Sequence, residues 1–214
     1  MAYRVDSVQG AYFLKVYNKR ESGTAAQLEK LDLCMAVACW LESYISLHGC
    51  ISAPLLTKEG NVKAETQGYA CLLFPYIDGI TPRGVILSTN QQQQLSAIVG
   101  ELHRHGTDVP FDLSAIQEDY NIPCAHLLNL PHKPGDPFCI YRQRDTILCA
   151  INQTHELAQR VKTAGLPFVL CHTDIHGSNL MQSDRLVLID WESIKFAPPR
   201  RISMPFGAIG AGAM

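Results

Sequence analysis

The sequence lacks any marked excess of charge of one sign. Its 214 residues carry 18 Lys and Arg against 20 Asp and Glu, which gives a formal net charge of −2. A chain with so little positive charge has no bulk attraction for nucleic acid or for anionic lipid. We therefore expect neither a nucleic acid nor a membrane surface among its partners.

Long apolar runs and an export signal are absent too. Although 47% of the residues are hydrophobic, no run approaches the ~18 apolar residues that a membrane helix needs. The N-terminus has no basic region followed by an apolar stretch, which a secretory leader would have. The eight cysteines never form a Cys-x-x-Cys pair, which disfavours structural zinc and a disulfide framework. These features predict a cytoplasmic protein of one or two domains with buried thiols.

A strand hairpin is predicted at the N-terminus. Residues 3–8 alternate apolar and polar side chains, and residues 12–17 are rich in strand formers and include one basic residue, Lys15. The turn signal Gln9-Gly10 joins the two segments. Further strands are expected in this part of the chain at 53–57 and 69–74.

A helix with two apolar faces is predicted after the hairpin. The segment 24–27 has the form of a capping box, and Gly49 would end the helix near His48. Apolar residues recur at helical spacing along two separate stripes, so we expect the helix to be covered on two sides. The stripes are Leu28, Leu31, Met35 and Cys39, and Leu33, Val37, Trp40 and Tyr44.

The second half of the chain is predicted to be mostly helical, and a linker near 78–82 would separate it from the first. The predicted helices are 88–105, 147–164 and a short one near 124–130. Apolar strands are predicted at 168–171 and 186–189. No internal repeat is visible.

The densest cluster of polar residues lies at the ends of these two apolar strands. His172, Asp174 and Asn179 follow the first strand, and Asp190 follows the second. Carboxylate and amide oxygens are the ligands that Mg²⁺ prefers, and Mg²⁺ needs few of them from protein. Phosphoryl transfer uses such a set, in which one Asp takes a hydroxyl proton, an Asn and a second Asp hold metal, and a distant Lys steadies the phosphates.

The His-x-Asp-x-x-x-x-Asn pattern over 172–179, followed by the Ile-Asp pair at 189–190, resembles the catalytic loop and metal-binding aspartate of the protein-kinase-like fold. In its details it is similar to the aminoglycoside phosphotransferase family. Trp191 after the metal aspartate resembles the spectinomycin and macrolide kinase branches of that family. The similarity spans about residues 3–199.

The resemblance implies an α+β fold of two lobes. Residues 1–78 would form an antiparallel-sheet N-lobe, and residues 79–199 a mostly helical C-lobe. The implied cofactors are ATP and Mg²⁺. The implied acceptor is a hydroxyl of a small molecule, such as an aminoglycoside, an aminocyclitol or a related amino alcohol.

The same resemblance assigns a role to individual residues. Asp174 is the implied catalytic base in a loop that His172 orients by hydrogen bonding. Asn179 and Asp190 are the implied Mg²⁺ ligands, and Lys15 would pair with the α- and β-phosphates. The residues of the hinge implied to meet the nucleotide are Phe74, Tyr76 and Ile77.

The acidic partner of Lys15 on the following helix is open between two residues. Glu29 has the residue type that the family uses. Asp32 lies closer to the first apolar stripe when positions are projected at ~100° per residue. We take Glu29 as the expected partner and keep Asp32 as the alternative.

The two ends of the chain depart from the family pattern. The family's first strand and Gly-containing phosphate loop would precede Tyr3, and its closing helices would follow Pro199. Residues 200–214 instead form a small-residue tail with no amphipathic period. A change of reading frame after Pro199 is one hypothesis for this tail. We expect little phosphotransferase activity from residues 1–214 by themselves.

Two other functions are compatible with the same residues. One is a degenerate kinase-like module that binds nucleotide without turnover. The other is a metal-dependent hydrolase that uses His172, Asp174 and His176. Tightly bound zinc would identify the hydrolase, whereas Mg²⁺-dependent nucleotide binding would identify a kinase-like protein, and turnover would separate the enzyme from the module.

Overall fold

The computed structural model describes residues 1–120 and 143–199. The short helix predicted near 124–130 and the tail 200–214 lie outside the described residues.

The chain divides into two compact units, one formed by 1–117 together with 168–214 and the other by 118–167. The second unit contains helix α3 (Arg144–Thr163), which confirms the helix predicted at 147–164. All the predicted site residues belong to the first unit. The lobe boundary near residue 78 is a different division and stays a prediction.

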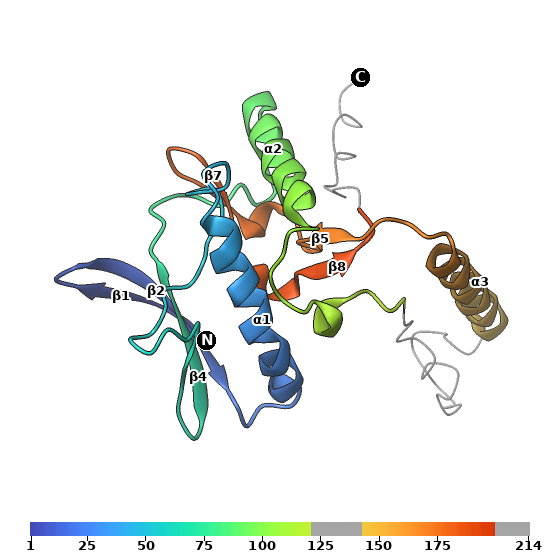
Figure 1. The fold of residues 1–214 in the computed structure, drawn as a ribbon, viewed down its shortest axis with the longest axis horizontal. Helices are drawn as coiled ribbons and strands as arrows, with labels where there is room; N and C mark the ends of the chain where they lie inside the picture. Colours follow the sequence, from blue (N-terminus) through green and yellow to red (C-terminus); the bar gives the residue numbers. More distant parts are fainter. Residues whose placement is uncertain (121–142, 200–214) are drawn as a thin grey trace. The chain divides into compact units, whose positions relative to one another are not determined.

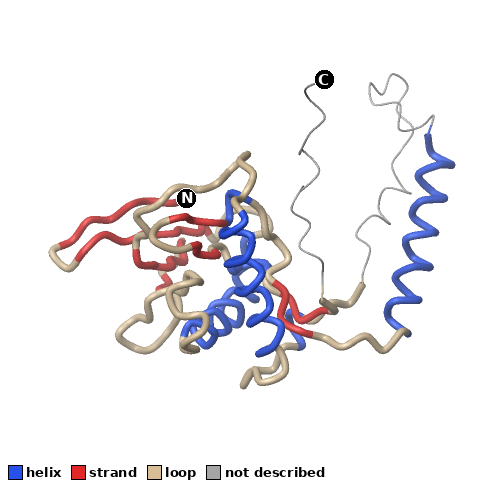
Figure 2. The backbone as a smooth tube through the Cα atoms, turned by 90° about the horizontal axis from the view of Figure 1, so that it is seen from above, coloured by secondary structure: helices blue, strands red, loops and turns tan. Residues whose placement is uncertain are grey.

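A four-stranded antiparallel sheet forms the N-terminal part of the first unit (Figure 1). Its strands are β1 (Ala2–Ser7), β2 (Gly10–Asn18), β3 (Ala64–Glu65) and β4 (Tyr69–Pro75), in the order β1-β2-β4-β3. The predicted hairpin is confirmed, with Ser7 opposite Gly10 at its turn. The tip of this hairpin projects away from the helices of the unit (Figures 1 and 2).

Residues 53–57, predicted as a strand, do not form one. Pro54 has no backbone N–H to give to a ladder. Leu55 donates one backbone hydrogen bond to the carbonyl of Leu73 in β4, at 2.7 Å, and Thr57 turns back to Asn61. The segment therefore lies beside the sheet without joining it.

Helix α1 (Thr24–Glu42) lies on one face of this sheet (Figure 1). It is covered on two sides as predicted, since residues of both apolar stripes, among them Leu31 and Val37, are buried. It ends at Glu42 rather than near His48. The predicted capping box is wrong, because Gly23 is the N-cap and no side chain caps the helix.

Helix α2 (Thr89–His105) begins with a capping box formed by Ser88 and Gln91. Its buried face is Leu95, Ile98, Val99 and Leu102. Glutamines of its first turns hold the C-terminal part of the chain, since Gln91 Nε2 donates to Gln182 Oε1 at 2.9 Å and the Leu186 N–H donates to Gln94 Oε1 at 2.9 Å.

Two small two-stranded sheets complete the first unit, and one of them, β6–β7, is a hairpin. The strands are β5 (Val169–Cys171) paired with β8 (Lys195–Ala197), and β6 (Leu180–Gln182) paired with β7 (Leu186–Leu188), all antiparallel. Short 3-10 turns are η1 (Ser114–Ile116), η4 (Gly177–Asn179) and η5 (Trp191–Ser193). Strands β5 and β7 confirm the prediction, but β6 and β8 were missed, so this region contains more strand than the mostly helical lobe that the sequence predicts.

The described ranges test two expectations from composition, that the chain has no membrane helix and that its thiols are buried. None of the helices there is both long and apolar enough to cross a bilayer. Cys34 is buried and Cys39, Cys50 and Cys71 are partly buried, as expected for core thiols, whereas Cys149 on α3 is exposed.

Candidate active site

The loop between β5 and β6 is fixed from inside by His172. This side chain is buried, and its Nε2 lies 2.9 Å from the carbonyl oxygen of Ile189, while its ring meets the edge of Trp191 at a centroid distance of 4.9 Å. Burial lowers the pKa of His172 below its ordinary value. A neutral imidazole donates from Nε2 to the carbonyl. These contacts suit a residue that positions the loop.

The backbone of the loop turns sharply before Asp174. Thr173 has φ 61°, a left-handed conformation that is rare for a β-branched residue. Its hydroxyl donates to the backbone carbonyl of Ser193, and the Asp174 N–H donates to the His172 carbonyl at 2.9 Å. Hydrogen bonds on both sides thus hold Asp174 at the surface of the loop, where its side chain is 51% exposed.

The two oxygens of the Asp174 carboxylate have different neighbours. Asn179 Nδ2 donates to Oδ2 and to the Asp174 backbone carbonyl, both at 2.9 Å. His176 Nε2 lies 3.4 Å from Oδ1, and His176 Nδ1 accepts from the Ser178 N–H. The accepting Nδ1 leaves the imidazole proton on Nε2, facing Asp174. The carboxylate is therefore oriented but open to solvent.

The register of β6 and β7 brings Asn179 and Asp190 to the same end of a hairpin. Leu180 pairs with Leu188, so Asn179 and Ile189 are the next residues on each side, and the Ile189 N–H donates to the Asn179 carbonyl at 3.0 Å. Asp190 follows in a left-handed conformation with φ 65°. Because Asn179 Nδ2 donates to Asp174, the Asn179 side-chain oxygen is the atom that can bind another partner.

The donor chemistry at this end of the hairpin fits Mg²⁺. An amide oxygen and a carboxylate are hard ligands, and Mg²⁺ keeps several waters beside one or two protein ligands. The zinc alternative has less support, because the His172 ring faces the Ile189 carbonyl and Trp191. Across residues 1–120 and 143–199, no three or more His, Cys, Asp or Glu side chains gather around one point that could hold a metal ion.

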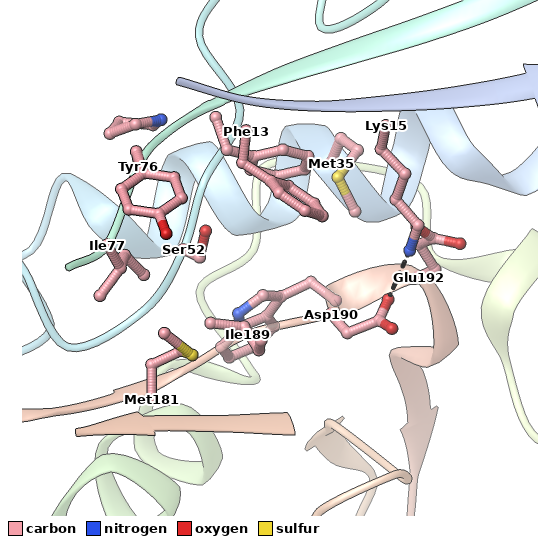
Figure 3. Close-up of a pocket in the computed structure, with 13 residues that line it drawn as sticks. Phe13, Lys15, Met35, Ser52, Tyr76, Ile77, Met181, Ile189, Asp190 and Glu192 are labelled. Atoms are coloured by element: carbon pink, nitrogen blue, oxygen red, sulfur yellow. Dashed lines mark hydrogen bonds and ion pairs between the residues drawn. The ribbon is translucent and has the colours of Figure 1, made fainter. Parts of the chain in front are cut away.

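Lys15 reaches from β2 to the residues that follow β7. Its Nζ lies 3.1 Å from Asp190 Oδ1 and also forms an ion pair with Glu192 (Figure 3). The expected partner Glu29 is exposed on α1, and the alternative Asp32 pairs with Lys63 at 2.6 Å. The prediction of a helix carboxylate was wrong for this structure, because the lysine points to the C-terminal hairpin.

Burial and charge act against each other on Lys15. Removal of its ammonium group from water favours the neutral amine, but the attraction of Glu192 and then of Asp190 outweighs this effect and raises the pKa of Lys15 above its ordinary value. Burial and the neighbouring Glu192 raise the pKa of Tyr17. Tyr17 therefore stays a hydrogen-bond donor, and Lys15 stays cationic, at neutral pH.

A cavity of about 320 Å³ opens beside this ion pair (Figure 3). The predicted residues Lys15, Phe74, Tyr76, Ile77 and Asp190 all line it. His172, Asp174 and Asn179 are outside its lining and are linked to it through the Ile189 backbone. The cavity walls are mostly apolar, and its charged groups gather at one end.

The sequence analysis did not assign the other lining residues to the site, namely Phe13, Met35, Ser52, Pro75, Met181, Ile189, Trp191 and Glu192. Strand periodicity could have found Phe13, because it lies two residues before Lys15 and so on the same face of β2. Phe13 packs against Phe74 with ring centroids 6.3 Å apart. No local pattern marks Met35 or Ser52, which reach the cavity only through the packing of α1 and the segment after it.

The fold and the site define a class of protein that comparison with known sequences bears out. Residues 2–200 match the model of the phosphotransferase enzyme family. The chain belongs to this family, and it has the kinase-like fold of its members.

Particular relatives resemble the chain over much of its length. Protein StrN of Streptomyces griseus is 24% identical over 169 residues, which cover 72% of this chain and 53% of StrN. Spectinomycin phosphotransferase, solved with ADP and spectinomycin, superimposes with a TM-score of 0.63 at 18% identity, over 92% of this chain and 61% of that one. Amicoumacin kinase, solved with AMP-PNP and Ca²⁺, gives 0.60 at 17% identity, over 91% and 56%. The chain thus spans about half to three fifths of the length of these proteins.

Proposed function

We propose that the protein is an ATP-dependent phosphotransferase that acts on a hydroxyl group of a small molecule. One observation carries the proposal: Lys15 and Asp190 meet at 3.1 Å at the charged end of an otherwise apolar cavity. A nucleotide has the same division into an aromatic base and a charged phosphate chain.

The apolar part of the cavity suits a flat aromatic base. Phe13 and Phe74 form its wall from adjacent strands, and Tyr76 and Ile77 continue it. Aromatic and aliphatic side chains stack well on a base, while a few polar groups orient it. The backbone of residues 76–77, where β4 has ended, would offer those polar groups, apart from the Tyr76 N–H, which donates to the Ala11 carbonyl at 3.1 Å.

The charged end suits phosphates with a bound divalent cation. Asn179 and Asp190 would hold Mg²⁺, which would supply positive charge to neutralise the negative charge that develops during transfer. Lys15 would pair with phosphate oxygens from the opposite side, as a cation that stays protonated. Lys15 comes from β2, and Asn179 and Asp190 flank the same end of the β6–β7 hairpin, so the fold sets their spacing.

Asp174 is the proposed catalytic base. Its carboxylate would accept the proton of the acceptor hydroxyl while the acceptor oxygen bonds to the γ-phosphorus and the bond from that phosphorus to the leaving ADP oxygen breaks. Asn179 holds Oδ2, and His176 faces Oδ1, so the carboxylate is oriented before the acceptor arrives. His172 supports this arrangement through the Ile189 carbonyl.

The acceptor class is proposed from relatedness. Spectinomycin phosphotransferase was solved with spectinomycin, and other similar structures are named as an amicoumacin kinase and an aminopropanol kinase. These names support an acceptor that is an aminocyclitol or aminoglycoside antibiotic or a related amino alcohol.

The test is acceptor-stimulated release of ADP, measured with a panel of aminoglycosides, spectinomycin, macrolides, choline and amino-sugar alcohols. The expected result is Mg²⁺-dependent turnover with at least one acceptor, which is lost in Asp174→Asn. Mg²⁺-dependent nucleotide binding without turnover on any acceptor would support the non-catalytic module instead. A protein that binds no Mg-nucleotide in a calorimetric titration would contradict the proposal.

A further inference from the structure

The Glu192 side chain has three polar partners beside the cavity. Its carboxylate accepts hydrogen bonds from Tyr17 Oη and, at 2.8 Å, from Gln27 Nε2, and it forms an ion pair with Lys15. The three partners come from two elements, β2 and α1, while Glu192 itself belongs to η5. One carboxylate therefore joins the sheet, the helix and the turn that follows the metal-binding position.

Glu192 and Asp190 differ in how closely the protein encloses them. The Glu192 side chain is 10% exposed, and that of Asp190 is 39% exposed. Asp190 contacts Lys15 through Oδ1 at 3.1 Å. A buried carboxylate with several donors is costly to move, because any donor left behind loses its partner. An exposed carboxylate in a single ion pair moves more easily.

Gln27 supports this difference. It is the fourth residue of α1 and lies three residues after Thr24, where the predicted capping box would place a capping side chain. Its amide instead crosses to Glu192, and the start of α1 has no side-chain cap. The Gln27 side chain thus holds the Glu192 carboxylate and does not cap the N-terminus of α1.

We propose that Glu192 is the fixed anchor of Lys15 and that Asp190 is its exchangeable partner, released to the metal when Mg-nucleotide binds. This inference rests on the proposed function and adds a positioning residue to it. Glu192 takes the place that the sequence resemblance gave to a carboxylate of α1. It holds Lys15 by charge from one side and leaves the other side of the ammonium group for a phosphate.

Loss of Glu192 would change the balance at Asp190. Lys15 would keep only Asp190 as its carboxylate partner, and the ammonium group would then compete with Mg²⁺ for the same oxygens. Mg-nucleotide affinity would fall even though neither metal ligand had been changed. Affinity for the acceptor would change little, because Asp174 is held by a separate set of contacts.

The first measurement needs no nucleotide. An amine-selective reagent is applied in small amount, and the labelling rate of Lys15 is followed by peptide mass spectrometry. We expect Glu192→Gln to raise this rate at least about threefold, because an amine that loses its ion pair with the enclosed carboxylate is held less firmly and is more accessible to the reagent. The matched control is Glu59→Gln, the same change in the exposed turn before β3.

The second measurement is a calorimetric titration with Mg-ATP, followed by steady-state kinetics. Glu192→Gln should weaken Mg-ATP binding about 10- to 100-fold, the effect of losing a charged hydrogen bond. The KM for nucleotide should rise and kcat should fall, while the KM for the acceptor stays unchanged. Glu29→Gln tests the competing assignment and should change neither binding nor labelling.

The outcomes separate the inference from the proposed function. If Glu192→Gln labels and binds like the wild type, or if Glu29→Gln gives the larger effect, the anchor role is overturned. If Glu192→Gln does not fold, Tyr17→Phe removes one of the donors to Glu192 and should give an intermediate labelling rate; an unchanged rate would overturn the role equally. A wild-type protein that binds no Mg-nucleotide contradicts the proposed function, and the labelling result still decides whether Glu192 holds Lys15.

Discussion

The backbone N–H of Ile189 donates a hydrogen bond to the backbone carbonyl of Asn179 at 3.0 Å. This bond extends the β6–β7 ladder by one step and fixes the residue before Asp190 against the last residue of the loop that carries Asp174. His172 Nε2 donates a hydrogen bond to the backbone carbonyl of the same Ile189. The catalytic loop and the metal-binding position are thus tied through both polar groups of one apolar residue.

Asp174→Asn should lower turnover about 10²- to 10⁴-fold, because the amide cannot accept the hydroxyl proton. Mg-nucleotide binding should remain, since Asn keeps an oxygen that can accept from Asn179. Turnover and calorimetry on the same preparation measure both effects. Asp184→Asn, the same change in the exposed turn between β6 and β7, is the control. A rate within about threefold of wild type would show that Asp174 is not the base.

Asn179→Ala and Asp190→Ala should weaken the binding of Mg-nucleotide and raise the Mg²⁺ concentration that turnover requires. Each removes one hard oxygen ligand from a site that has few. The KM for the acceptor should stay close to that of the wild type. Titration with Mg²⁺ at fixed ATP provides the measurement, and an unchanged Mg²⁺ requirement in both variants would exclude the metal role.

The segment after β4 approaches the β6–β7 hairpin and the loop before it closely at two glycines. A Cβ on Gly79 would lie 2.5 Å from the Gln182 carbonyl oxygen, and one on Gly177 would lie 2.6 Å from that of Pro82. Because backbone atoms cannot give way, Ala at either position should destabilise the protein by about 1–3 kcal/mol.

The matched control for these glycines is Gly100→Ala in the middle of α2, where a Cβ would meet nothing within 4 Å. That change should instead stabilise the fold by about 0.5–1 kcal/mol, because Ala is the better helix former. Urea denaturation measures all three variants. The two kinds of glycine should shift the midpoint in opposite directions, and shifts of the same sign would refute the close approach.

The stability of the protein should fall as the pH drops below about 6.5, and His172 should cause part of the fall. Burial lowers the pKa of His172 in the folded state below its ordinary value of 6.5. Between the two pKa values the unfolded chain binds the proton and the folded chain does not, so protonation favours unfolding. Above the unfolded pKa this contribution is fully present, and it is lost as the pH falls through the folded pKa.

Denaturation of wild type and His172→Gln at a series of pH values tests this expectation. The variant should be less stable at neutral pH and should lose less stability on acidification. His155→Gln on α3, where the side chain is exposed, serves as control and should follow the wild type. Parallel pH profiles for wild type and His172→Gln would show that His172 does not contribute.

Local pattern was enough to predict the elements whose partners are close in sequence. The β1–β2 hairpin, helix α2 and strands β5 and β7 follow directly from alternation, helical spacing and turn residues. Predicted residues also line the cavity, because the family resemblance extended to the strand of Lys15 and to the hinge as well as to 172–190. Segment 53–57 was wrongly predicted as a strand from its apolar content. Pro54 limits its backbone pairing, and the apolar pattern does not take that into account.

Glu192 and Gln27 show where such reasoning stops. Gln27 lies at the position of a capping residue, and only the three-dimensional packing of α1 against η5 gives its amide a better partner. Glu192 is part of a recognisable run after β7, but it contacts Lys15 and Tyr17, and the Tyr17 contact joins residues 175 positions apart in the chain. Pairings at that separation depend on how the elements are packed.

Thr173 and Asp190 both adopt left-handed backbone conformations, with φ of 61° and 65°. Residues with a Cβ pay for such geometry, at about 1–3 kcal/mol each. The two turns on which the proposed chemistry depends therefore lower the free energy of unfolding of the protein. Selection for thermostable variants should therefore favour glycine at these positions. The loop would then be more flexible at the point where the proposed reaction requires it to be fixed.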